Sequence, residues 1–207
     1  MAGKTDHALE RMVFFSDAVF AIAITLLVIE LHPPVFDKGT PDLVHVNALL
    51  MMIPSFFGFA VSFAVVGMFW IGHHRAFALT ARYSPKILGW NMLLLGLIAF
   101  MPFATAYLSA NHFQRVPTLL YCTTLLLAGL VNLKVNWTAT SAPIVDPATP
   151  ADAIAYVRVR GVAVILGAAF ALVLSAFAPQ YGIYGLASIG IWRRLLQDRV
   201  RRRYLPA

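Results

Sequence analysis

The chain has 207 residues, of which 60% are hydrophobic and 12% charged, and its mean hydropathy is +0.76. A soluble domain carries about twice that share of charged residues, so this composition excludes a sizeable soluble domain and makes lipid the solvent for most of the chain. The formal net charge of +7 is distributed between apolar segments and in the C-terminal tail. This distribution indicates membrane topology and contact with anionic lipid, and not nucleic-acid binding.

Six apolar segments follow one another along the chain, each near the length that crosses a bilayer. The first stops at Pro33-Pro34 and carries a polar cluster, so we expect a retained helix and not a signal peptide. The second contains Pro54 and is long enough to require a tilt or a kink. The longest loop is expected at 136–152. We predict an all-α, polytopic membrane protein with one transmembrane domain over residues 1–207 and helices at about 12–31, 46–72, 87–108, 116–133, 157–178 and 181–196.

The basic residues indicate how the predicted helices are oriented in the membrane. With the N-terminus inside and six spans, the outer loops hold only Lys38 and Arg115 of the 16 Lys and Arg residues. The other basic residues then all lie on the cytoplasmic side, as the positive-inside rule requires. We therefore predict that both termini are cytoplasmic.

Polar side chains inside a membrane helix are costly, and each is a candidate functional residue. The first helix buries the carboxylate of Asp17, and a stripe of mostly apolar side chains runs along the face roughly opposite to it. The stripe consists of Arg11, Phe15, Ala18, Ile22, Thr25, Leu26 and Ile29. From periodicity alone, two interpretations stay open: the stripe packs against other helices, or it lines a pore.

A motif in the first helix points to one family. The run from Arg11 to Leu26 reads R-x-x-x-F-S-D-A-x-x-x-I-x-x-T-L and resembles the signature of the transmembrane protein 175 family, which comprises potassium-permeable channels of bacteria and endolysosomes. The resemblance continues in Phe-Trp-Ile-Gly-His-His-Arg at 69–75, in Gly-Trp-Asn at 89–91 and in Met-Pro-Phe at 101–103. It covers roughly residues 8–108.

The resemblance implies a six-helix subunit that assembles as a four-fold homotetramer around an axial pore lined by the first helix. It also implies a hydrophobic constriction at Ile22, Leu26 and Ile29, with hydroxyl groups from Thr25. No T-V-G-Y-G-like segment occurs, so a backbone-carbonyl filter is not expected. A structural polar network that ties the first helix to the next two is also expected. Its donors to the buried Asp17 carboxylate are Trp70, His73 and Asn91. The whole network comprises Arg11, Phe15, Ser16, Asp17, Trp70, His73 and Asn91.

The expected function is therefore a potassium-permeable channel subunit of a cell membrane, the bacterial inner membrane, with potassium, other monovalent cations and membrane lipids as partners. Two rivals stay open: a proton-coupled secondary transporter that uses Asp17 and His73, and a structural or lipid-binding membrane protein. No catalytic motif or metal-ligand spacing is present in the sequence, so we expect no enzyme activity, no metal and no cofactor.

Overall fold

The computed structural model describes residues 2–111 and 114–204, with side chains described from His7 onward. This part of the chain is helical, and its only β-type contact is an isolated bridge between Thr80 and Val145. The elements are α1 (Ala2–Ile29), α2 (Asp42–Met51), α3 (Ile53–Phe77), α4 (Pro85–Ala110), α5 (Arg115–Ala139), α6 (Ala151–Phe177), α7 (Pro179–Gly182), the 3-10 helix η1 (Ile183–Ala187) and α8 (Ser188–Tyr204).

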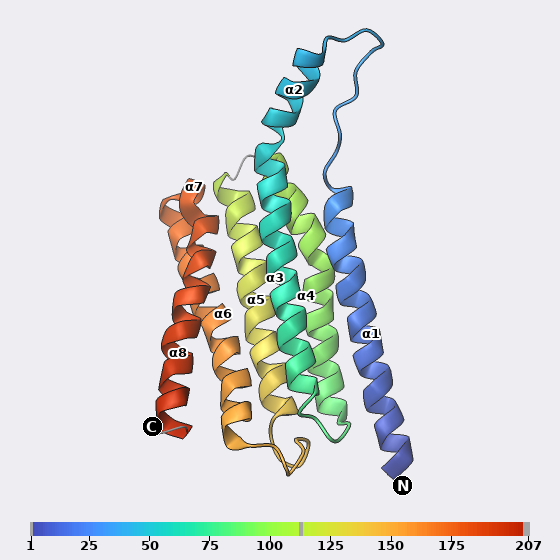
Figure 1. Cartoon of the computed structure of the whole chain (residues 1–207), viewed down its shortest axis with the longest axis vertical. Coiled ribbons are helices and arrows are strands. Elements are labelled where there is room, and N and C mark those ends of the chain that lie inside the picture. Colours follow the sequence, from blue (N-terminus) through green and yellow to red (C-terminus); the bar gives the residue numbers. More distant parts are fainter. Residues whose placement is uncertain (1, 112–113, 205–207) are drawn as a thin grey trace.

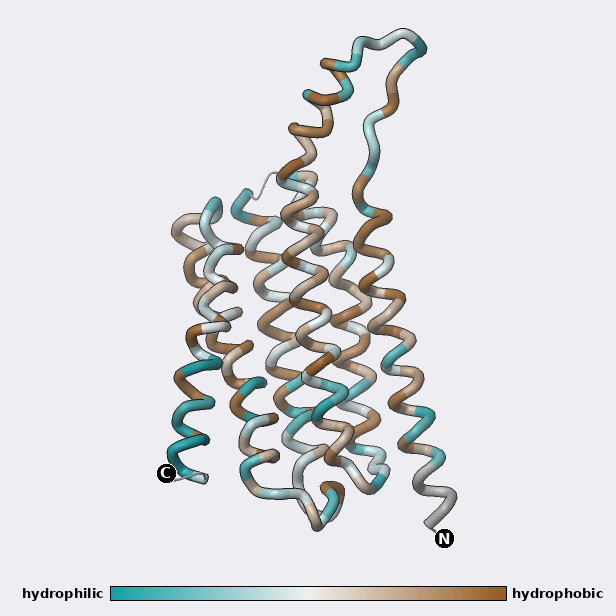
Figure 2. The backbone as a smooth tube through the Cα atoms, in the orientation of Figure 1, coloured by the Kyte–Doolittle hydropathy of each residue, from teal (hydrophilic) through white to brown (hydrophobic). Residues whose placement is uncertain are grey.

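The long helices form one bundle, shown in Figure 1. α5 packs against α4 and α6, α8 packs against α6, and α1 lies at the rim on α4 and α3. The start of α1 and the end of α8 lie at the same end of the bundle (Figure 1). Figure 2 shows hydrophilic residues gathered at that end, including the C-terminal half of α8.

Five helices of the described chain are long and apolar enough to cross a membrane. They are His7–Ile29 of α1, Ile53–Phe77, Pro85–Ala110, Arg115–Ala139 and Ala151–Phe177. The predicted sixth helix at 181–196 is instead divided between α7, η1 and α8. α8 has 17 residues and ends in the basic triplet Arg201, Arg202 and Arg203, which explains why it is not among the five.

The predicted second helix, 46–72, is two helices. α2 ends at Met51 and α3 begins at Ile53, with Met52 between them. Pro54 lacks a backbone N–H, and the break places it in the first turn of α3, where that N–H has no helical partner to lose. α2 extends beyond the bundle (Figure 1), and none of its residues is buried.

The remaining helices are longer than their apolar segments. The predicted helix at 116–133 continues to Ala139, and the one at 157–178 begins at Ala151, so the loop expected at 136–152 shortens to 140–150. The helix predicted at 87–108 begins at Pro85 behind Ser84, whose Oγ accepts a hydrogen bond from the Lys86 N–H over 3.3 Å. The one predicted at 12–31 runs from Ala2 to Ile29. Hydropathy marks the apolar part of a helix, whereas backbone hydrogen bonds continue into its polar ends.

Candidate functional site

α1 presents one face to the bundle. Its buried residues recur at intervals of three or four along the helix, and they are Met12, Ser16, Phe20, Ala23 and Leu27. This spacing produces a single stripe on an α-helix, and α3 and α4 are the helices that it packs against. The contact with the bundle therefore fixes which way the rest of α1 faces.

The residues predicted to form the constriction lie on the other side of α1. The exposed fractions of Ile22, Leu26 and Ile29 are 58%, 39% and 66%. Thr25 is exposed on the same side, and its Oγ1 donates to the carbonyl of Ile22 over 2.9 Å. A branched apolar stripe with one hydroxyl group per chain thus stands open along the rim of the bundle, where a second chain can reach it.

A buried chain of hydrogen bonds ties α1 to α3 and α4. Ser16 Oγ donates to the Met12 carbonyl over 2.7 Å, Asn91 Nδ2 donates to Ser16 Oγ over 2.8 Å, and His73 Nε2 lies 2.9 Å from Asn91 Oδ1. The Met12 carbonyl can only accept, so the Ser16 hydroxyl group donates to it and accepts from the NH2 group of Asn91. The Asn91 oxygen then faces His73 and can only accept, so Nε2 of His73 carries the proton. Three helices are linked here through side chains that are all 0% exposed.

This series of hydrogen bonds ends at an atom that has no partner. His73 Nδ1 is buried and has no hydrogen-bond partner within the described residues. The imidazole ring lies against two aromatic rings, with centroids 5.5 Å from that of Phe20 and 4.3 Å from that of Phe77. His73 is therefore held by packing and by one hydrogen bond.

Asp17 has a separate partner. Trp70 Nε1 donates to Asp17 Oδ1 over 2.9 Å, and the Trp70 ring centroid lies 5.8 Å from that of His74. Asp17 is half-buried, and the indole of Trp70 is 39% exposed. The bond therefore lies at the edge of the contact between α1 and α3.

The structure does not bring every predicted network residue together. Arg11 and Phe15 lie on the exposed side of α1, where Phe15 is 50% exposed. In the part of the chain that the structure describes, the one ion pair joins His7 and Glu10, so Arg11 forms none with Asp17.

A second polar cluster was not predicted from the sequence. Thr105 Oγ1 donates to Ser62 Oγ over 2.8 Å, and Ser62 Oγ lies 3.0 Å from the Tyr121 hydroxyl group, which joins α3, α4 and α5. The usable signal was the spacing of Ser62 and His73, which are three helical turns apart and so share the buried face of α3.

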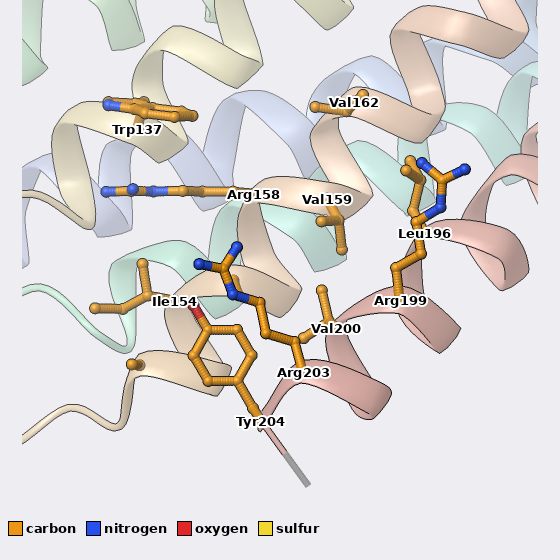
Figure 3. Close-up of a pocket in the computed structure, with 12 residues that line it drawn as sticks. Trp137, Ile154, Arg158, Val159, Val162, Leu196, Arg199, Val200, Arg203 and Tyr204 are labelled. Atoms are coloured by element: carbon orange, nitrogen blue, oxygen red, sulfur yellow. The ribbon is translucent and has the colours of Figure 1, made fainter. Parts of the chain in front are cut away.

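Arg158 of α6 is another anchor that sequence reasoning missed. It donates to Thr140 Oγ1 over 3.0 Å, to the Thr140 carbonyl over 2.8 Å and to Ser141 Oγ over 3.1 Å. Its guanidinium carbon lies 4.1 Å from the centroid of the Trp137 ring, and Figure 3 shows the two groups stacked. Arg158 thereby fastens the loop after α5 onto α6.

The region around α1 matches a known family. Residues 11–102 match the model of the endosomal/lysosomal potassium channel TMEM175. The chain is 46% identical to a potassium channel of Chamaesiphon minutus over 99 residues, which are 48% of each chain. It is 34% identical to a potassium channel of Streptomyces collinus over 155 residues, which are 72% of this chain and 74% of that one. The chain belongs to the TMEM175 family.

The fold agrees with this TMEM175 membership. The crystal structure of a lysosomal potassium-selective channel TMEM175 homolog from Chamaesiphon minutus is similar with a TM-score of 0.74 at 29% identity, over 94% of this chain and 98% of that one. Family membership, predicted from the α1 motif, is confirmed. The five apolar helices and the family together identify a multi-pass membrane protein. The matched residues 11–102 include every predicted constriction and network residue.

Proposed function

We propose that four copies of this TMEM175-family chain form a potassium-permeable cation channel around a pore lined by α1. The observation that carries the proposal is the exposed stripe of Ile22, Leu26 and Ile29, which lies opposite the buried face of α1. α1 lies at the rim of the bundle, as a helix shared between chains must. Two relatives named potassium channels support the choice of ion.

A four-fold arrangement would turn each stripe residue into a ring of four side chains. Rings of Ile and Leu form a hydrophobic constriction, which blocks ions when it is dry and conducts when a small widening lets water in. The hydroxyl group of Thr25 lies between Ile22 and Leu26 in sequence and would offer oxygen atoms to a partly dehydrated cation. Such a pore selects among cations without a carbonyl filter.

The hydrogen bonds behind α1 have a positioning role in this proposal. Ser16 is bonded to Asn91, and Asp17 to Trp70, so α1 is held against both α4 and α3. These two bonds fix the rotation of α1 about its own axis, which determines whether Ile22 points toward the pore axis. The network thus acts on conduction through helix orientation.

The proposed topology has six crossings, with both termini in the cytoplasm of a bacterium and the protein in its inner membrane. The end of the bundle that holds the start of α1 and the end of α8 would then face inward (Figure 1). The segment from Ile183 to Tyr204, made of η1 and α8, would provide the sixth crossing.

The proposal is tested by Ile22→Asn in protein reconstituted into liposomes, with potassium and sodium flux as the measurement. An amide at the constriction should wet the ring, raise potassium flux and weaken discrimination against sodium. Ile24→Asn is the matched control, because Ile24 is partly buried and packs against the core, so Asn there should lower the yield of folded protein and not change selectivity.

Equal flux changes at both positions, or none at Ile22, would exclude α1 as the pore lining. Flux that saturates at carrier turnover and requires a proton gradient would instead favour the transporter alternative with Asp17 and His73.

A further inference from the structure

A second site lies away from α1, in a cavity between α3, α5, α6 and α8. The cavity has a volume of about 250 Å³. Its polar lining comprises Arg75 of α3, Asn132 and Asn136 of α5, Arg160 of α6 and Arg193 of α8. Four helices thus contribute polar groups to one small space.

Several of these groups are buried without partners. Asn132 and Asn136 are 4% and 2% exposed, and their Oδ1 atoms have no hydrogen-bond partner within the described residues. The Nε of Arg160 is likewise buried and unpaired there. Unpaired buried polar groups are costly, and several around one cavity can be satisfied together by a polar ligand. A half-turn of either amide presents its NH2 group to the cavity in place of its oxygen.

The charge of the cavity identifies the ligand class. Three arginines line it, and no Asp or Glu does so among the described residues. None of the three forms a described ion pair. Guanidinium groups match the geometry of phosphate oxygens through paired N–H donors, so the ligand is an anion with several oxygen atoms.

The position of the cavity agrees with a phosphate group at a membrane surface. Arg75 lies in the last turn of α3, at the end of the bundle where hydrophilic residues gather (Figure 2). Basic pockets between membrane helices at this depth bind lipid headgroups. The side chains of Met68, Ile71 and Val157 add an apolar part to the lining, which suits the glycerol and acyl portions of a lipid.

We propose that this cavity binds a phosphate group, from a lipid headgroup or from free phosphate, held by Arg75, Arg160 and Arg193. The amides of Asn132 and Asn136 donate their N–H groups to the same oxygens. The bound phosphate fastens α8 to α3, α5 and α6. This site goes beyond the proposed conduction, and it does not depend on α1 lining a pore.

The test uses the purified full-length chain in a neutral detergent, with the dissociation constant and the midpoint of thermal unfolding as measurements. One arm titrates dioctanoyl phosphatidylglycerol against dioctanoylglycerol, which lacks the phosphate group. The other compares sodium phosphate with sodium chloride at equal ionic strength. Saturable binding of phosphatidylglycerol alone identifies a lipid headgroup, and binding of both phosphate ligands identifies the phosphate group itself. Binding of neither, or equal binding of dioctanoylglycerol, refutes the site.

Variants locate the binding. Arg75→Gln with Arg193→Gln should weaken binding about tenfold or more, because each removes a charged hydrogen-bonding partner. Arg199→Gln with Arg203→Gln is the matched control, since both arginines line the neighbouring groove of α6 and α8 shown in Figure 3, where no described lining atom is buried and unpaired. The control pair should change binding less than twofold. Equal losses in both pairs would show general charge attraction and overturn the proposal.

Asn136→Asp provides a test that does not remove a side chain. The change keeps the size of the side chain and places a negative charge among the three guanidinium groups. It should abolish phosphate binding while the unliganded chain unfolds at the same temperature or higher, because the carboxylate occupies the place of the anion. Phosphate binding as tight as that of the wild type would refute the assignment of this cavity.

Discussion

Asn91 is the residue on which the attachment of α1 depends. Its amide donates to Ser16 and accepts from His73, so one side chain joins α1, α3 and α4. The amide can do both because its NH2 group donates while its carbonyl oxygen accepts. All three residues are buried, and water cannot replace a lost partner.

Asn91→Leu should therefore destabilise the chain. Leucine is of similar size, but Ser16 loses its donor and His73 is left with both ring nitrogens unpaired, at a cost of about 1–3 kcal/mol for each unsatisfied group. Thermal unfolding in detergent measures the loss. In a double-mutant cycle with Ser16→Ala, the two costs should sum to more than that of the double variant, since they remove one shared bond. Strictly additive costs would mean that the bond contributes nothing.

How far the sequence could predict these contacts is clear from Ser16 and Asp17. Helical periodicity predicts that adjacent residues face about 100° apart, and the structure directs Ser16 to Asn91 and Asp17 to Trp70. The sequence could name the candidate partners by their donor groups. It could not assign each to Ser16 or Asp17, because that depends on how α3 and α4 are rotated about their own axes. Periodicity did place Arg11 on the stripe side of α1, and this is the side that the structure leaves exposed.

Among the elements, the segment after α6 departs most from the sequence prediction. Its apolar composition predicts one helix at 181–196, but the chain turns through α7 and η1 before α8 begins. The turn lies very close to α6: a Cβ atom at Gly185 would lie 2.8 Å from the Cα of Ala171. Hydropathy records which residues avoid water but not how near two backbones approach, so this turn was not predictable from the apolar pattern.

Gly185→Ala should thus lower stability, by about 1–3 kcal/mol, because the added methyl group forces η1 away from α6. Gly190→Ala is the matched control in the same segment. A Cβ there meets nothing within 4 Å, and alanine in a helix is favoured over glycine by up to about 1 kcal/mol. The midpoint of thermal unfolding should fall for the first variant and stay or rise for the second. Equal shifts would contradict the close contact between η1 and α6.

At the scale of the whole molecule, a single chain leaves one side of α1 uncovered, although α1 is the helix that carries the family motif. α1 carries the family motif and bonds to α3 and α4, yet its Ile22, Leu26 and Ile29 side is open. In lipid, exposed apolar side chains alone do not require a partner, since acyl chains can cover them. What separates the stripe from a lipid-facing surface is the hydroxyl group of Thr25, which lies on the same exposed side of α1. The assembly, and not the single chain, would complete the site.

Cross-linking between chains decides whether this side of α1 meets other copies. Ile22→Cys in native membranes, treated with a flexible bismaleimide, should give a covalent dimer, because copies of α1 would surround one axis and the one accessible cysteine of each chain can join only one other chain. The native Cys122 is buried and should add no background. Val173→Cys on α6 is the matched control, since Val173 and Ile22 are both 58% exposed in the single chain. The Val173→Cys protein should stay monomeric, because a residue that faces lipid does not meet its copy in another chain. Cross-linking at Val173 and none at Ile22 would move the contact between copies to α6 and remove the basis for a pore lined by α1.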